Sequence, residues 1–230
     1  MSKLIVYLNG GLGNQMFQYA SALGLSKDHG FDLVIDTSTG FIRDYQYRRN
    51  YELDHFHISS RNATFIERLP FILLRIHKRF SKSHSSFIEK HWYGTFLIEN
   101  KLNYLTYLSQ AFFHRSIWMC GYWQSYLYFQ KYTQILLNDL IPPKPSDSYL
   151  LKLGNSMRAT ESVALGIRLY EESNDPSAHA HNGKVKSVAE IQSAINVILA
   201  RLNNPQFLIF CMERYDIFNQ LIIPKSSIFI

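Results

Sequence analysis

A glycine-rich turn between an apolar run and a helical pattern is the feature that most constrains the fold of this chain. Residues 4–8 form the apolar run, residues 10, 11 and 13 are glycines, and apolar residues then recur at 16, 17, 20 and 23. This order predicts a strand, a tight loop and a helix. Glycines allow a sharp turn, and the N–H groups at a helix start favour an anion. The loop therefore points to phosphate or sugar recognition, although a plain turn without a ligand explains the glycine spacing equally well.

The loop does not fit the common nucleotide-binding patterns. The run from Gly11 to Met16 lacks the third glycine of the dinucleotide fingerprint, and no Gly-Lys-Ser/Thr sequence follows to form a P-loop. Asn14, Gln15 and Gln18 instead supply amide side chains that a bare turn does not need. Residues 10–20 as a whole resemble the N-terminal signature of glycosyltransferase family 11. Its members are inverting fucosyltransferases, typically alpha-1,2, that transfer fucose from GDP-fucose to a galactoside.

This resemblance implies a fold, a donor and a set of site residues. It implies an α/β chain with two Rossmann-like domains of the GT-B type, and a reaction that needs no metal and no cofactor besides the donor substrate. The chain contains no Asp-x-Asp motif for a divalent metal. By the same resemblance, Asn14 lies near the donor and the reaction centre and is a candidate catalytic residue. The candidate donor-binding residues in this loop are Gly11, Gly13, Asn14 and Gln15.

The next elements predict that the sheet begins with parallel strands. The apolar run of residues 31–36 reads as a second strand, which makes a strand–helix–strand unit. Asp36, at its end, either holds a sugar hydroxyl or caps the following turn. A basic and aromatic segment with Arg43, Arg48 and Arg49 either contacts an acceptor glycan or, as the favoured interpretation, is a solvated connection. A strand-like alternation then follows at Leu53, Phe56 and Ile58.

Residues 65–80 carry the pattern of a basic amphipathic helix, with Pro70 interrupting its first part. The favoured interpretation is a surface helix that packs its apolar face on its own core. The alternative is a peripheral helix on an anionic membrane, since enzymes of this resemblance often act on lipid-linked glycans at the inner membrane face. The expected apolar face is Phe65, Ile66, Leu69, Ile72, Leu73, Ile76 and Phe80, with Arg68, Arg75, Lys78, Arg79 and Lys82 between or just beyond these residues.

A second element of the resemblance follows another predicted strand. Residues 117–121 read as a strand that ends in glycine, and Tyr122, Trp123 and Gln124 come directly after it. Ligands of α/β proteins bind at the carboxyl ends of parallel strands, so these side chains are expected at the mouth of the sheet. Gly-Tyr-Trp-Gln-Ser resembles an element of the family that an acidic and basic pair commonly follows. In this chain the pair is replaced by Tyr126 and Leu127.

Three prolines within residues 142–145 predict a stiff connector between two domains. We therefore expect an N-terminal α/β domain at 1–141, which by the resemblance is the acceptor side, and a C-terminal GDP-fucose domain at 146–230. In the second, strands are predicted at 162–168, 206–211 and 226–230, with helices at 188–202 and 215–221. Family members usually continue beyond this point, so the second domain is expected to be incomplete at its C-terminus.

The first strand of the second domain ends in a candidate donor-binding cation. Arg168 matches an arginine that holds the GDP-fucose phosphates in a His-x-Arg-Arg-Gly-Asp-like motif of the resembling fucosyltransferases, and an arginine can clamp a diphosphate through paired hydrogen bonds. The histidine is replaced by Gly166, the second arginine by Leu169 and the Gly-Asp pair by residues 170–171. The base is not assigned by the motif: Glu171, the candidate catalytic residue, or Glu172 could serve by proximity to Arg168, and a structural ion pair of Arg168 with either glutamate is the alternative.

Composition narrows the class of partner. The net charge of +6 favours an anionic partner: a nucleotide sugar, a membrane surface or, as the weakest fit, nucleic acid, because no arginine-rich tail or RNA-binding signature is present. Two cysteines indicate no disulfide framework, and residues 1–8 show no secretory signal. We expect a cytoplasmic protein, peripheral at the inner membrane face if it binds lipid, with no nucleic-acid partner.

Two functions remain open from the sequence. The first is an inverting transferase that moves L-fucose from GDP-fucose to the 2-hydroxyl of a galactoside in a surface polysaccharide or glycan, with a lipid-linked acceptor as one form of this partner. The second is a catalytically inactive, truncated member that binds a glycan or a membrane. The glycines, Asn14 and Arg168 favour the enzyme, whereas the replaced histidine and the expected missing segment favour the inactive protein.

Overall fold

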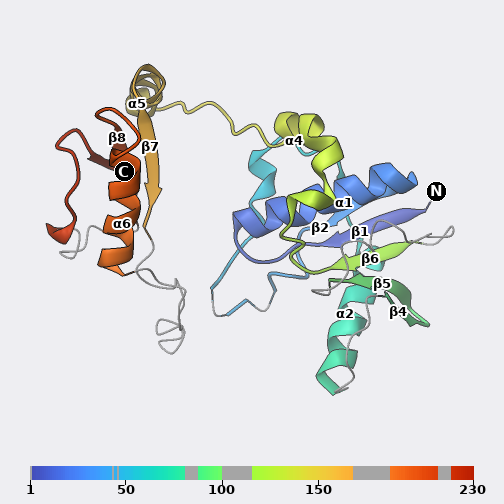
Figure 1. Cartoon of the computed structure of the whole chain (residues 1–230). Helices are drawn as coiled ribbons and strands as arrows, with labels where there is room; N and C mark the ends of the chain where they lie inside the picture. Colours follow the sequence, from blue (N-terminus) through green and yellow to red (C-terminus); the bar gives the residue numbers. More distant parts are fainter. Residues whose placement is uncertain are drawn as a thin grey trace. The chain divides into compact units, whose positions relative to one another are not determined.

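The computed structural model describes residues 2–42, 44–45, 47–80, 88–99, 116–167, 187–211 and 219–230, with the backbone alone at 78–80 and 88–89. The chain divides into two compact units, Met1–Pro143 and Lys144–Ile230. The division falls within the proline-rich segment of residues 142–145. Each unit is a mixed α/β structure with parallel strands (Figure 1).

The first unit is built on a six-stranded sheet in the order β3-β2-β1-β6-β5-β4. All neighbouring strands pair in parallel except β4, which runs antiparallel to β5. The chain moves outward from β1 to β3 and then approaches β1 again from the other edge, so the strand order reverses between β1 and β6. Ligands of open α/β sheets bind at such a switch point. The strands are β1 (Lys3–Tyr7), β2 (Asp32–Asp36), β3 (Arg61–Asn62), β4 (Ile88–His91), β5 (Gly94–Ile98) and β6 (Ile117–Cys120).

Helices cover the two faces of this sheet, and each helix has its own apolar core. α1 (Leu12–His29) packs with alternate residues of β1, β2 and β6, such as Leu4, Val6 and Met119. α2 (Phe65–Phe80) packs with the residues in between, such as Ile5 and Phe96 (Figure 1). Short helices follow β2 and β6: η1 (Leu53–His55), η2 (Tyr126–Tyr128), η3 (Gln130–Tyr132) and α4 (Thr133–Asp139).

Two local expectations for the first unit are wrong. Residues 53–55 form a 3-10 helix and not a strand, because Leu53 alone of this segment is fully buried and its carbonyl accepts from the Phe56 N–H. Pro70 does not interrupt α2, which runs through it, and the proline itself is buried. Because Pro70 lacks an N–H, its helical hydrogen bond to residue 66 is missing, but its ring contributes to the buried side of the helix.

The apolar face expected for α2 is also wrong. Phe71 and Leu74 face the sheet and are 1% and 5% exposed, whereas Phe65 and Ile66 are 70% and 76% exposed. Ile76 is exposed as well. The helix itself, Phe65–Phe80, has the predicted bounds. Its packed side is therefore nearly opposite to the side that periodicity indicated: of the apolar residues counted in the pattern, Phe65, Ile66 and Ile76 are exposed, and Leu69, Ile72 and Leu73 are half-buried.

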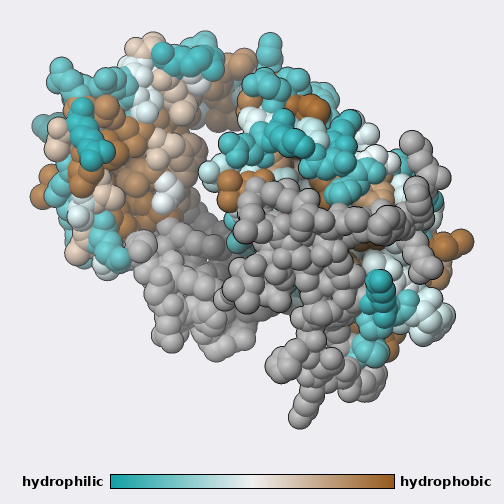
Figure 2. All heavy atoms as spheres, turned by 45° about the vertical axis from the view of Figure 1, so that its right-hand side comes forward, coloured by the Kyte–Doolittle hydropathy of each residue, from teal (hydrophilic) through white to brown (hydrophobic). Residues whose placement is uncertain are grey.

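The second unit contains a three-stranded parallel sheet in the order β7-β8-β9. Its core joins α6 to β8 through Ile191, Ile195, Phe207 and Ile209. Figure 2 shows that hydrophobic side chains also gather on the visible surface of this unit, on the left. Helix α5 was not expected from periodicity, but Asp147 caps its start by accepting from two N–H groups. The elements are α5 (Ser148–Ala159), β7 (Ser162–Gly166), α6 (Val188–Leu199), β8 (Gln206–Phe210) and β9 (Ile228–Phe229).

The sequence located most of these elements to within a few residues. α6 begins at the predicted residue because Ser187 and Glu190 form a capping box, each side chain bonding the other residue's backbone N–H. The helix expected at 215–221 falls mainly outside the described residues. Among the helices in the described part of the chain, none is long and apolar enough to cross a bilayer.

Candidate functional site

The glycine loop leaves β1 at the carboxyl edge of the sheet and opens α1. Gly10 has a φ of +75°, and a Cβ there would lie 2.6 Å from the Asn14 side-chain amide nitrogen, so the turn and the position of Asn14 both require glycine. Gly11 is the N-cap and offers no side chain to the first N–H groups of the helix. Nothing lies within 4 Å of the position of a Gly13 Cβ. The helix start is thus open to an approaching group, as anion binding requires.

Gln15 holds this loop from inside the protein. Its side chain is fully buried, and its amide nitrogen donates to the carbonyl oxygens of Gly10, at 2.9 Å, and Asn50, at 2.8 Å. Its amide oxygen accepts from the Glu52 N–H at 2.9 Å. The predicted binding residue Gln15 therefore uses its amide on backbone groups, and it positions the loop against residues 50–52.

Gln18 joins the loop to the end of β6. It is fully buried, its amide oxygen accepts from the Asn9 N–H at 3.0 Å, and its amide nitrogen donates to the Gly121 carbonyl at 3.1 Å and to the Asn9 side chain. Buried polar groups are costly unless they are paired, and this one side chain pairs groups from the ends of two strands. Gln18 therefore fixes the switch point between β1 and β6.

The turn after β6 brings Gln124 to Asn14. Gly121 has a φ of +138°, and a Cβ there would lie 2.3 Å from the Cβ of Glu99, so glycine is required. The Glu99 carboxylate accepts from the N–H groups of Tyr122 and Trp123, at 2.7 and 2.9 Å, and anchors the turn. Gln124 then donates from its amide nitrogen to the Asn14 side-chain oxygen at 2.6 Å. The two predicted family elements therefore meet through this hydrogen bond.

Arg49 lies beside the open helix start. A Cβ on Gly11 would be 3.9 Å from the Cζ and Nε atoms of Arg49, so the guanidinium group lies next to the loop. The Asp44 carboxylate shapes this segment by accepting from the N–H groups of Tyr47 and Arg49, both at 3.1 Å. The Arg49 guanidinium also lies 5.7 Å from the centre of the Tyr47 ring. The favoured interpretation of this segment as a solvated connection therefore overlooked a half-buried cation at the loop.

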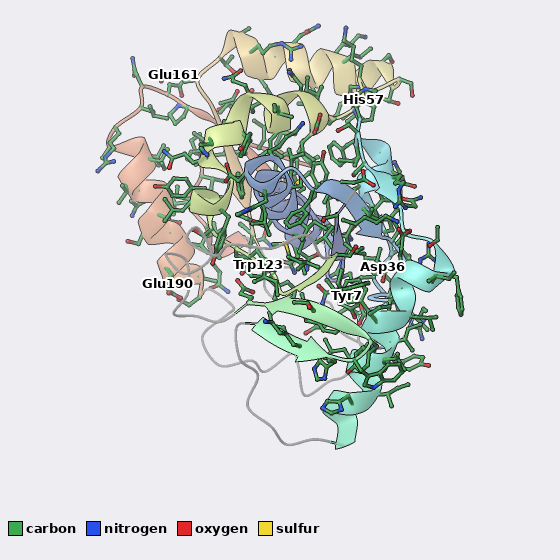
Figure 3. The ribbon with its side chains drawn as sticks, turned by 90° about the vertical axis from the view of Figure 1, so that its right-hand side faces the viewer. Tyr7, Asp36, His57, Trp123, Glu161 and Glu190 are labelled. Atoms are coloured by element: carbon green, nitrogen blue, oxygen red, sulfur yellow. The ribbon has the colours of Figure 1, made fainter. Side chains whose placement is uncertain are left out.

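Asp36 caps the turn after β2, which is one of its two predicted roles; a contact with a sugar hydroxyl stays a prediction. Its Oδ1 atom accepts from the N–H groups of Ser38 and Thr39, at 3.1 and 3.0 Å, and lies 3.8 Å from Arg68 Nε. Asp36 pairs with Tyr7 across the strands, and both lie at the same edge of the sheet (Figure 3). Burial raises the pKa of Tyr7, with Arg75 acting in the opposite direction. The Tyr7 hydroxyl therefore stays a neutral group at this edge.

Gly40 allows the turn after β2 to pack against the glycine loop. A Cβ at Gly40 would lie 1.9 Å from the Leu8 carbonyl oxygen and 2.9 Å from the Asn9 Cβ. The clash is with backbone, so a larger residue would push the two loops apart. The sequence offered one signal for this contact: a Ser/Thr-rich turn ending in glycine directly after a strand.

The structure brings together only the predicted residues of the first unit. Gly11, Gly13, Asn14 and Gln15 lie at the loop, whereas Arg168 and Glu171 fall outside the described residues. Arg49 and Glu99 were missed, because nothing in the spacing relates them to the loop. Across the described ranges, no group of three or more His, Cys, Asp or Glu side chains is placed to hold a metal ion.

Comparison with known proteins gives one relative in sequence and several in fold. No protein-family model matches the chain. The chain is 27% identical over 218 residues to an alpha-1,2-colitosyltransferase of Escherichia coli, and the match covers 91% of this chain and 69% of that protein. This relative is a glycosyltransferase by name, the class of enzyme that the resemblance to glycosyltransferase family 11 implies.

Solved structures of a fucosyltransferase share the fold of this chain. NodZ of Bradyrhizobium, an alpha-1,6-fucosyltransferase, has been solved with GDP and after soaking with GDP-fucose. Both of these structures match with a TM-score of 0.50 at 9% identity, covering 100% of this chain and 78% of NodZ. At this identity the likeness shows the fold alone, a mixed α/β fold with parallel strands.

Proposed function

We propose that this protein is an inverting glycosyltransferase that moves L-fucose from GDP-fucose to the 2-hydroxyl of a galactoside in a surface polysaccharide or glycan. In this proposal the two units are the halves of a GT-B enzyme: the first faces the acceptor, and the second holds the GDP-sugar. The relationship to an alpha-1,2-colitosyltransferase supports the transfer of a fucose-like sugar and the alpha-1,2 linkage. The NodZ structures with GDP and GDP-fucose support a GDP-sugar donor.

The observation that carries the proposal is the construction of the α1 start. Gly11 leaves the N–H groups of the first turn without a side-chain cap, and Arg49 lies next to that glycine. Helix N–H groups and a guanidinium together suit the charge of a phosphate group. Gln15 and Gln18 hold the loop with buried hydrogen bonds, so the site is built before any ligand arrives. A turn with no ligand would not need this support.

The proposed chemistry is a single displacement at the anomeric carbon of the sugar. The acceptor hydroxyl attacks, its proton passes to a base, and the bond to the GDP oxygen breaks through an oxocarbenium-like transition state. Arg49, the α1 start and, from the sequence, Arg168 stabilise the negative charge that develops on the diphosphate. Asn14, held by Gln124, orients the reacting groups. Glu171 is our candidate for the base.

The proposal is tested by titrating the purified chain with GDP in a calorimeter. Arg49→Ala should weaken binding about tenfold to hundredfold, the cost of losing a charge-assisted hydrogen bond of roughly 1.5–3 kcal/mol. Arg48→Ala is the matched control, because Arg48 is the exposed neighbour in the same segment. Arg168→Ala, with the exposed Arg201→Ala as its control, tests the predicted cation of the second unit.

A transfer assay then identifies the sugar and the linkage. GDP-fucose and GDP-colitose are each offered with a galactoside, and the product linkage is read by NMR. The name of the sequence relative makes colitose the second candidate sugar. GDP binding without transfer from either donor would leave a nucleotide-binding protein and exclude the proposed activity, and a folded chain that binds no GDP would exclude the donor as well.

Gly13→Ala should leave stability unchanged within about 0.5 kcal/mol, because its Cβ meets open space, and should weaken GDP binding.

A further inference from the structure

The outer face of α2 is apolar. Glu67, Phe71 and Leu74 turn toward the sheet and are buried. The helix advances 100° per residue, so residues 65, 69, 72 and 76 form a continuous row on the opposite side. This row, the outer α2 face, consists of Phe65, Leu69, Ile72 and Ile76; its two ends are 70% and 51% exposed, and Leu69 and Ile72 between them are half-buried. An exposed apolar row on a helix is unusual for a surface that meets only water.

The outer α2 face carries two arginines at its edge, of which Arg68 already faces a carboxylate, its Nε atom lying 3.8 Å from Asp36 Oδ1. Arg68 and Arg75 flank the row, with Arg75 donating one guanidinium N–H to the Thr39 carbonyl at 2.7 Å. The one acidic residue of the helix, Glu67, points inward to Lys3 and Arg61, each at 2.7 Å from its Oε1 atom. In the sequence, Lys78, Arg79 and Lys82 extend the basic character through the last turn and beyond.

An exposed tryptophan lies in the hairpin next to this helix. Trp92, between β4 and β5, is 91% exposed. The hairpin contacts α2 through His91, whose ring centre lies 5.0 Å from that of His77. Tryptophan is enriched at membrane interfaces because its ring has an apolar body and a polar N–H. Trp92 thus directly follows a residue that packs against α2.

We propose that the outer α2 face and Trp92 bind the surface of a bilayer that contains anionic lipids. The apolar row would enter the boundary between headgroups and acyl chains, Trp92 would lie at headgroup depth, and the flanking cations would meet lipid phosphates. A second copy of the chain is a poorer occupant, because a symmetric contact would place the cations of two α2 helices against each other. This inference goes beyond the proposed transfer reaction and does not depend on it.

The test is co-sedimentation of the full chain with lipid vesicles. We expect binding to vesicles of phosphatidylcholine and phosphatidylglycerol in equal parts, and little binding to phosphatidylcholine alone. Phe65→Asp with Ile76→Asp should reduce the bound fraction at least about tenfold, since it places charges within the apolar row. Arg75→Gln should lower affinity about fivefold, the equivalent of about 1 kcal/mol per basic residue near the surface. Ile222→Asp is the matched control, because Ile222 is an exposed isoleucine of the second unit, and should bind as the wild type does.

Three outcomes would overturn the inference. The first is a folded chain that does not bind anionic vesicles, and the second is equal binding by the wild type and the Phe65→Asp, Ile76→Asp variant. The third is a wild-type dimer in light scattering that the same variant dissociates, which would identify a second copy as the occupant. GDP titration of the same samples separates this result from the proposed function, because no residue of the outer α2 face contributes to the glycine loop.

Discussion

The two long helices of the first unit reverse the usual relation between polarity and burial. α1 carries Gln15, Gln18 and Ser21, and all three are fully buried. α2 carries Phe65 and Ile66, and both are largely exposed. The difference arises from what covers each helix on the side away from the sheet. α1 is covered there, because Tyr19 donates to the Asp139 carboxylate of α4 at 2.5 Å and a Gly24 Cβ would lie 2.6 Å from the Tyr128 carbonyl (Figure 1).

This comparison shows what hydrophobic periodicity measures. A periodic apolar row indicates that one side of a helix differs from the other, but not which side meets the protein. In α2 the packed side is supplied by Phe71 and Leu74, which lie off the expected row. In α1 the polar side chains are buried because they have specific partners in neighbouring loops. Burial therefore follows the neighbours of a helix as well as its own pattern.

The largest expected effect is a difference between two phenylalanines of α2. Phe71→Ala should lower the free energy of unfolding by about 3–5 kcal/mol, because it leaves a cavity where a side chain is 1% exposed. Phe65→Ala should change it by less than about 0.5 kcal/mol, because the side chain is 70% exposed. Urea unfolding followed by tryptophan fluorescence reports this unit, since residues 92, 118 and 123, the three tryptophans, all belong to it. Similar losses for both variants would mean that the outer α2 face is covered.

A smaller effect is expected at the buried amide of α1. Gln18→Leu keeps the size of the side chain but removes its hydrogen bonds to Asn9 and Gly121, so buried backbone groups lose their partner. We expect a loss of about 3 kcal/mol in the same urea titration, with weaker GDP binding. Gln134→Leu, at an exposed position of α4, is the control and should be nearly neutral. A neutral Gln18→Leu would show that the buried amide does not hold the switch point.

The smallest effect concerns the start of α2 and depends on pH. Hydrogen bonds from Arg61, and further from Lys3 and Thr64, hold the pKa of Glu67 well below its ordinary value of 4.5, against the opposing effect of burial. Because the folded pKa is lowered, the stabilisation is complete above about pH 4.5 and is lost as the pH falls toward the folded value. Glu67→Gln should therefore cost about 2 kcal/mol at neutral pH and progressively less in acid.

The control for this prediction is a carboxylate without such a network. Asp54 is exposed, and its Oδ1 atom lies 3.9 Å from the Nε2 atom of His55. Asp54→Asn should leave the free energy of unfolding, measured by urea titration from pH 7 to pH 3, within about 0.5 kcal/mol of the wild type. A cost of Glu67→Gln that stays constant over this range would contradict the role of the Glu67 charge in attaching α2.

Much of the fold could be predicted from the sequence, because it depends on local signals. The glycines after β1, the capping box at Ser187 and the apolar runs of β2 and β8 each specify their element within a few residues. The sequence also predicted the two segments that resemble the family, residues 10–20 and 121–125, and the structure joins them through the hydrogen bond from Gln124 to Asn14. Short helices at 53–55 and 148–159 were missed because their apolar residues show no clear period.

The sequence by itself determined the order of the elements, the glycine loop and the resemblance to a family of fucosyltransferases. These follow from backbone constraints at glycine, from short-range periodicity and from motifs that lie within a few consecutive residues. Only the tertiary structure decided that Arg49 lies beside Gly11, that Gln15 and Gln18 face inward and that α2 turns an apolar row outward. Each of these depends on contacts between residues far apart in the chain, and no local pattern records which distant segments pack together.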